Sequence, residues 1–106
     1  MLDGKKFGRY DLVASLYMLL GNPVRLKILG LLQNQSMSFS ELMHALAVNP
    51  KVLSNCLSKL AEFQLVTRSY PHRVYVLTPP GRRIFREQVE AVYDYFETFA
   101  KPVKEE

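Results

Sequence analysis

Two Asn-Pro pairs, Asn22-Pro23 and Asn49-Pro50, most constrain what this chain can fold into. An Asn side chain can cap the free backbone N–H groups at a helix start, and Pro is well tolerated at the first helical position because no N–H is needed there. Apolar residues follow each pair at helical spacing. The pairs therefore predict one helix over residues 23–32 and another over residues 50–63.

A further helix start lies between these two. Ser38 and Glu41 have the S-x-x-E spacing of a capping box, and they predict a short helix over residues 39–46. Residues 47–49 alone separate it from the helix that begins at Pro50. Two short helices joined by so tight a turn form a helix-turn-helix.

The ends of the chain are expected to flank this motif with one helix each. Asp11 is expected to cap a helix over residues 11–20, and residues 1–9, with Gly4 and Gly8, are expected to form a flexible arm.

After the helix-turn-helix the apolar period changes from 3.6 to 2. Residues 66–70 and 74–78 are rich in β-branched and aromatic side chains and are separated by Pro71-His72-Arg73, which predicts a hairpin. Pro79-Pro80-Gly81 ends the second strand, and a last helix is expected over residues 82–100. The predicted fold is mainly α (α+β): one winged helix-turn-helix domain, residues 10–101, with a two-stranded wing and a C-terminal dimerisation helix.

Composition excludes several classes of protein. The chain has 106 residues, 48% of them hydrophobic, which is typical of one globular domain. Its single cysteine, Cys56, excludes an intrachain disulfide and is expected to act as a small buried hydrophobe rather than a redox switch. Polar residues interrupt every apolar run well before the ~18 residues of a membrane span, so we expect a cytoplasmic protein with no membrane partner.

Charge is distributed unevenly along the sequence. The formal net charge is +4, with seven Lys and Arg but one acid over residues 51–86, and four acids but no Lys or Arg over residues 87–97. This pattern indicates one surface that faces a polyanion, or a mixed surface that merely looks clustered in sequence.

The second helix of the motif is expected to carry a DNA-reading face. Leu53, Leu57 and Leu60 define its buried side, so the opposite side is exposed. Asn55 suits a bidentate pair with adenine, and serine and lysine suit bases or phosphates; the alternative is an ordinary solvated face. The candidate DNA-binding residues on this helix are Lys51, Ser54, Asn55, Ser58 and Lys59.

The hairpin adds three candidate DNA-binding residues: Arg68 on its first strand, and His72 and Arg73 at its tip. Arginine is favoured in a narrow minor groove or on adjacent phosphates. The alternative is a plain solvent-exposed turn. Arg82, Arg83 and Arg86 lie at the start of the last helix. They either serve surface solubility or contact phosphate, and the sequence supports phosphate contact less strongly.

The first and last helices predict a two-fold dimer. Apolar residues of the last helix step by 4, 3, 4 and 3, which is a heptad seam, and a monomer of this size would not cover them together with those of the first helix. Their aromatic rings either pack there, which we favour, or line a small apolar ligand pocket between subunits. The candidate interface residues are Leu12, Leu16, Tyr17, Phe85, Val89, Val92, Phe96 and Phe99.

Two stretches, LGNPVRLKILGLL (residues 20–32) and SFSELMHALAVNPKVLSNCLSKL (residues 38–60), resemble the arsenic-repressor-like (ArsR) winged-helix transcription regulators. Residues 49–83, from P-K-V-L-S to L-T-x-x-G, are also similar to the HxlR and MarR groups. The resemblance covers about residues 10–90 and implies a DNA-binding regulator. It also implies that Arg25 either has a structural role, which we favour, or contacts the DNA backbone. The family usually has Gly in the inter-helix turn, where this chain has Ala47. The N-terminal cysteine of the HxlR group is absent, so redox or aldehyde sensing is not implied.

Other chemistries have little support in the sequence. His44 and His72 lie in separate elements, too few and too scattered for a zinc site with its four donors, and no nucleophile has a plausible base and acid partner. We therefore expect no cofactor, no metal and no enzymatic activity. The predicted function is a homodimeric, sequence-specific double-stranded DNA-binding transcription regulator, a repressor that occludes promoters. The alternative is a winged-helix protein–protein interaction module in a transcription or chromatin assembly.

Overall fold

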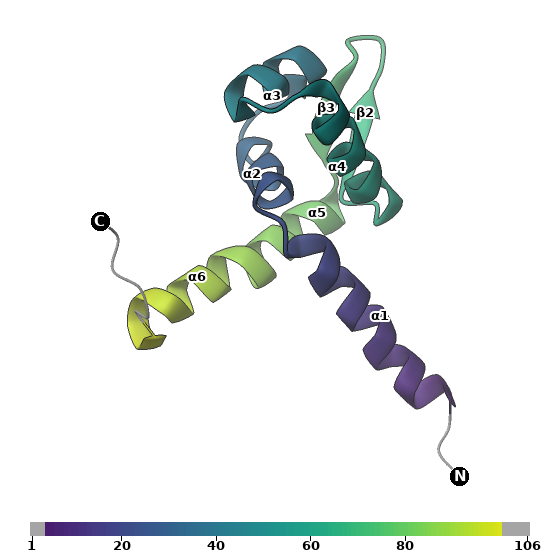
Figure 1. Ribbon diagram of the computed structural model, residues 1–106, viewed down its shortest axis with the longest axis vertical. Helices are drawn as coiled ribbons and strands as arrows, with labels where there is room; N and C mark the ends of the chain where they lie inside the picture. The colour runs from purple at the N-terminus through teal and green to yellow at the C-terminus, as the bar shows by residue number, and fades with distance from the viewer. Residues whose placement is uncertain (1–3, 101–106) are drawn as a thin grey trace.

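Helices α2 (Pro23–Leu31), α3 (Phe39–Leu46) and α4 (Pro50–Glu62) form the body of the molecule together with a small sheet. Helix α1 (Gly4–Leu20) and a C-terminal helix, residues 79–100, extend from this body in two different directions (Figure 1). The computed structural model describes residues 4–100. The arrangement is the predicted winged helix-turn-helix.

The predicted caps of α2, α3 and α4 are confirmed atom by atom. Asn22 Oδ1 accepts a hydrogen bond from the Arg25 N–H at 3.1 Å, and Asn49 Oδ1 accepts one from the Val52 N–H at 2.9 Å. The capping box is reciprocal, because Ser38 Oγ accepts from the Glu41 N–H while Glu41 Oε1 accepts from the Ser38 N–H. These local bonds fix where α2, α3 and α4 begin.

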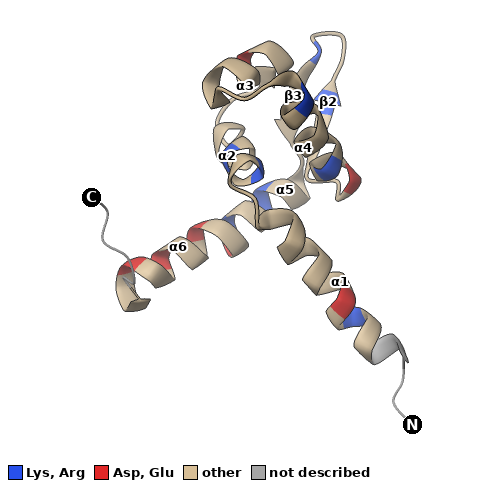
Figure 2. Ribbon diagram, in the orientation of Figure 1, with Lys and Arg blue, Asp and Glu red and all other residues tan. Residues whose placement is uncertain are grey.

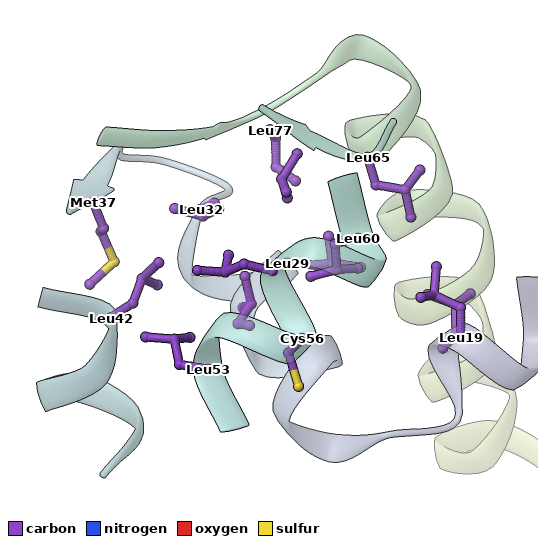
Figure 3. Close-up of a cluster of buried hydrophobic side chains, with 14 residues drawn as sticks. Leu19, Leu29, Leu32, Met37, Leu42, Leu53, Cys56, Leu60, Leu65 and Leu77 are labelled. Atoms are coloured by element: carbon purple, nitrogen blue, oxygen red, sulfur yellow. The ribbon is translucent and has the colours of Figure 1, made fainter. Parts of the chain in front are cut away.

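The core lies where α2, α3 and α4 meet the sheet and the C-terminal end of α1. Its fully buried side chains are large and apolar, and no charged side chain among the described residues is buried with them. Cys56 is 4% exposed and packs inside this cluster, as predicted for a small hydrophobe (Figure 3). The most completely buried members are Ile28, Leu29, Leu32, Leu42, Leu53 and Leu60.

The wing is a three-stranded antiparallel sheet, with one strand more than the sequence predicted. Strand β3 (Val74–Leu77) lies between β2 (Val66–Ser69) and β1 (Met37–Ser38). Val66 pairs with Leu77, and both side chains are buried against the core. Met37 pairs with Tyr75, which ties the start of the helix-turn-helix to the wing.

Two predicted helix starts are wrong. Helix α1 begins at Gly4 rather than at Asp11, so most of the segment expected to be an arm continues the helix; residues 1–3 lie outside the described part of the chain. The C-terminal helix begins at Pro79 rather than at residue 82, because Thr78 Oγ1 caps it by accepting from the Gly81 N–H at 2.9 Å.

The C-terminal helix is not uniformly α-helical. It runs through α5 (Pro79–Ile84), a π-helical segment η1 (Phe85–Glu90), α6 (Ala91–Tyr95) and a second π-helical segment η2 (Phe96–Ala100). Each π segment holds more residues per turn than an α-helix, so it rotates the following side chains relative to a regular heptad.

No single helix within residues 4–100 has both the length and the apolar composition to cross a membrane. The Phe7–Leu20 part of α1 and α2 satisfy those criteria only when taken together, and they are bent by 81° at the break between them.

Candidate nucleic-acid interface

Helix α4 presents a polar face to solvent, as its sequence predicts. Leu53, Leu57 and Leu60 are buried, and this anchors one side of the helix in the core. The opposite side is therefore held outward on a fixed frame. The exposed candidates on it are Lys51, Ser54, Asn55, Ser58 and Lys59.

The wing places its candidate residues on exposed positions. Arg68, His72 and Arg73 are all exposed. The Arg68 guanidinium lies 5.5 Å from the ring centre of Tyr75, which is its cross-strand partner, and 5.7 Å from that of Tyr70. The two rings restrict the guanidinium by cation–π contact without using its N–H donors. Neither tyrosine was among the site residues predicted from the sequence, although the strand register places Tyr75 opposite Arg68.

Charge separates along the molecule as the sequence indicated. Basic residues mark α4 and the wing, whereas acidic residues follow the distal part of the C-terminal helix (Figure 2). Between Lys51 and Arg86, Glu62 at the end of α4 is the one acid. A polyanion would therefore meet attraction at α4 and the wing, and repulsion at the distal helix.

Two arginines at the start of the C-terminal helix have partners inside the protein. Arg82 Nη1 donates to the Gln33 carbonyl at 2.7 Å, and Arg83 forms an ion pair with Glu87 at 3.0 Å. Both contacts favour a structural or surface role over a contact with phosphate. Arg25 also has the expected structural role, because its Nη1 donates to the Leu19 carbonyl at 3.1 Å and thereby joins α2 to the end of α1.

The candidate dimer residues form an apolar surface on the two extended helices. Leu12 and Phe99 are 73% and 77% exposed, and Tyr17, Val92 and Phe96 are about half exposed. Leu16 and Phe85 also pack against the core of their own chain. Val89 lines a groove of about 430 Å³ between the two helices, where Tyr17 Oη donates to Gln88 Oε1 at 2.9 Å.

Among residues 4–100, no three His, Cys, Asp or Glu side chains gather closely enough to hold a metal ion.

The turn of the helix-turn-helix has an unusual backbone. Ala47 adopts φ 54° and ψ 46°, the left-handed conformation that favours glycine. The turn forms nonetheless, and the Ala47 N–H donates to the Met43 carbonyl at 2.9 Å. From the sequence, the turn was expected to form with Ala47 in place of Gly if this residue need not take a positive φ; Ala47 does take a positive φ, and the turn still forms.

A three-stranded wing packed on a helix-turn-helix, with exposed cations on both, defines the class of this protein as a winged helix-turn-helix. Residues 22–68 match the model of the arsR family of bacterial regulatory proteins. The chain is thus an ArsR-like winged helix-turn-helix protein. No curated protein sequence is significantly similar to it.

Solved structures share this fold over nearly the whole chain. A homodimeric winged helix-turn-helix DNA-binding domain, Mb0332 from Mycobacterium bovis, is described as a possible ArsR-family transcriptional regulator; it is 27% identical, with 91% of each chain covered and a TM-score of 0.73. The transcriptional repressor BigR from Xylella fastidiosa is 24% identical, with 97% of this chain and 98% of that chain covered and a TM-score of 0.64. The quinone-bound YodB from B. subtilis is 22% identical, with 88% and 99% covered and a TM-score of 0.70.

Proposed function

We propose that this protein is a homodimeric transcription regulator that binds double-stranded DNA in a sequence-specific manner and represses by occluding promoters. The observation that carries the proposal is the exposed polar and basic face of α4, set beside a basic wing. In helix-turn-helix proteins this second helix enters the major groove and its N-terminal side chains reach the base edges.

The side chains on that face suit both base reading and backbone contact. Asn55 can form a bidentate pair with adenine, while Ser54 and Ser58 can bond to a base or a phosphate. Lys51 lies in the first turn, where guanine or phosphate is its natural partner, and Lys59 lies farther along, where it would neutralise backbone charge. Arg68, His72 and Arg73 would contact the minor groove or the flanking phosphates.

Dimerisation is supported by the apolar surface on α1 and the C-terminal helix, together with the homodimeric state given for Mb0332. Pairing these helices with their symmetry mates would cover side chains such as Leu12 and Phe96. A two-fold dimer would then present two α4 helices about 34 Å apart, one turn of DNA, to a pseudo-palindromic site.

Repression is the simplest outcome of such binding. A dimer seated on a promoter excludes other proteins from it without contacting them, and the structurally similar BigR is described as a transcriptional repressor. The rival role, a protein-interaction module, would need an apolar patch on α4. Within α4, which the structure describes in full, the one exposed large hydrophobic is Val52.

The test is fluorescence anisotropy on a labelled random duplex at two salt concentrations, with the solution mass measured in parallel. Lys51, Lys59, Arg68 and Arg73 give eight cations per dimer, so log K should fall with log salt at a slope of about −7. Between 50 and 200 mM salt this is a loss of about 10⁴-fold. A specific site would then be selected from a random pool.

The outcomes separate the parts of the proposal. A dimer whose affinity falls steeply with salt supports it. DNA binding by a monomer supports the DNA-binding function and refutes dimerisation through the apolar surface of α1 and the C-terminal helix. No binding even at low salt refutes the DNA function and favours the interaction module.

A further inference from the structure

The first turn of α4 carries a partly exposed apolar side chain that is not among the hydrophobic residues packed on the core. Val52 is 39% exposed, although its neighbour Leu53 is fully buried. A lone exposed valine needs no explanation on an ordinary surface. Here it lies in the turn that would enter the major groove, three residues from Asn55.

Helix stability does not account for a valine at this position. In α3 the third helical residue is Glu41, which completes the capping box and complements the positive end of the helix dipole. In α4 the equivalent position is Val52, and the first turn of α4 contains no acid. A β-branched side chain loses rotamer freedom in a helix, and one that stays 39% exposed regains only part of this cost by burial. The residue therefore points to a contact outside the chain.

The major groove offers a specific partner for such a side chain. Thymine is the one base that presents an apolar group there, its C5-methyl. Residues three apart on a helix have Cβ atoms about 5–6 Å apart, which is between one and two base-pair steps of about 3.4 Å each. An adenine bonded by Asn55 would thus lie within two steps of a base that Val52 can touch.

We propose that Val52 reads a thymine by packing on its C5-methyl, within two base-pair steps of the adenine paired with Asn55. The inference rests on the proposed DNA-binding function and narrows it: each half-site contains an adenine and a thymine within two base-pair steps of each other under the first two turns of α4. The absence of acid from that turn fits the same contact, since a carboxylate there would repel the flanking phosphates.

The experiment removes the thymine methyl and nothing else. In an operator selected with the wild-type protein, each thymine is replaced in turn by deoxyuridine, symmetrically in both half-sites, and affinity is measured by fluorescence anisotropy. One position is expected to weaken wild-type binding by about fourfold per half-site, or about 15-fold in all, which is the worth of one buried methyl at each.

The variant Val52→Ala identifies the residue responsible. It should bind the thymine operator more weakly than the wild type does, and it should lose less than about twofold on deoxyuridine substitution at the sensitive position. Val13→Ala, which shortens an exposed valine on α1, is the matched control and should keep the full wild-type sensitivity. Circular dichroism checks that both variants fold.

The possible results distinguish the Val52 contact from DNA binding itself. Sensitivity that disappears in Val52→Ala alone supports the inference. Tight, salt-dependent binding with no deoxyuridine-sensitive position, or with sensitivity that Val52→Ala retains, refutes the role of Val52 and leaves the DNA-binding function standing. Failure to bind any duplex overturns both.

Discussion

Replacing Ala47 with Gly is expected to stabilise this protein, although it removes a side chain from the turn of the helix-turn-helix. Ala47 ends α3 at φ 54° and ψ 46°, where the Cβ of an L-residue approaches the following carbonyl oxygen. The Ala47 side chain is exposed, so its methyl contributes little burial. Its backbone N–H keeps its bond to Met43 in either residue.

The magnitude follows from two opposing terms. Relief of the left-handed strain is worth about 1–2 kcal/mol. The greater freedom of Gly in the unfolded chain costs about 0.5–1 kcal/mol. The net gain is about 0.5–1 kcal/mol, which for a domain of this size raises the melting temperature by about 2–8 °C.

The assay is urea and thermal unfolding followed by circular dichroism, at one fixed protein concentration because dimerisation would make stability concentration-dependent. Ala45→Gly is the matched control: the same substitution two residues earlier, at an exposed position inside α3, should cost up to about 1 kcal/mol. Opposite signs for the two variants confirm the backbone argument. If Ala47→Gly destabilises as Ala45→Gly does, the reasoning is refuted.

Three further substitutions test other parts of the structure. Gly81→Ala should destabilise by about 1–3 kcal/mol or prevent folding, because its Cβ would overlap the backbone carbonyl of Leu65; an unchanged thermal melt would contradict this. Asn55→Ala should reduce discrimination between specific and random duplex. Arg73→Ala should instead weaken binding to both duplexes and lower the salt slope by about 2 per dimer. If both variants lose affinity equally on the two duplexes, Asn55 does not read a base. Leu12→Asp should shift the solution mass toward monomer without lowering helical content, since Leu12 is 73% exposed; an unchanged dimer would exclude α1 from the interface.

The helix-turn-helix was predictable because its signals are local. Asn22, Ser38 and Asn49 each bond to a backbone N–H three residues away, so sequence spacing alone places these caps. The same reasoning would have found the start of the C-terminal helix. Thr78-Pro79 is a third capping residue followed by Pro, and the prediction placed the helix three residues late by treating that Pro-Pro-Gly run only as a strand breaker.

The features that the sequence did not reveal depend on distant partners or on backbone geometry. Strand β1 has two residues, too few for an alternating pattern, and it exists because Met37 pairs with Tyr75 far along the chain. The positive φ of Ala47 arises because the chain must reverse between α3 and α4 within three residues. In α1, Gly4 and Gly8 suggested an arm, yet the helix continues through them. Base reading by Asn55, DNA contact by the wing and dimerisation through the apolar surface are still predictions from the sequence. The exposed positions of these residues are compatible with those roles.

The proposed dimer can set the spacing of its two α4 helices only if each α4 is rigidly joined to the α1 and C-terminal helices that would form the dimer interface. The structure supplies that connection through short polar bonds and close packing. Leu19 of α1 is buried in the core that anchors α4, and its carbonyl accepts the Arg25 bond. The C-terminal helix is fixed from the other side, where Arg82 binds the Gln33 carbonyl and Gly81 lies against the backbone of Leu65, just after α4. A rotation of either extended helix at its junction with the body would therefore have to displace α4 or break these contacts. In the proposed dimer, the spacing of the two α4 helices is thus tied to the geometry of the interface.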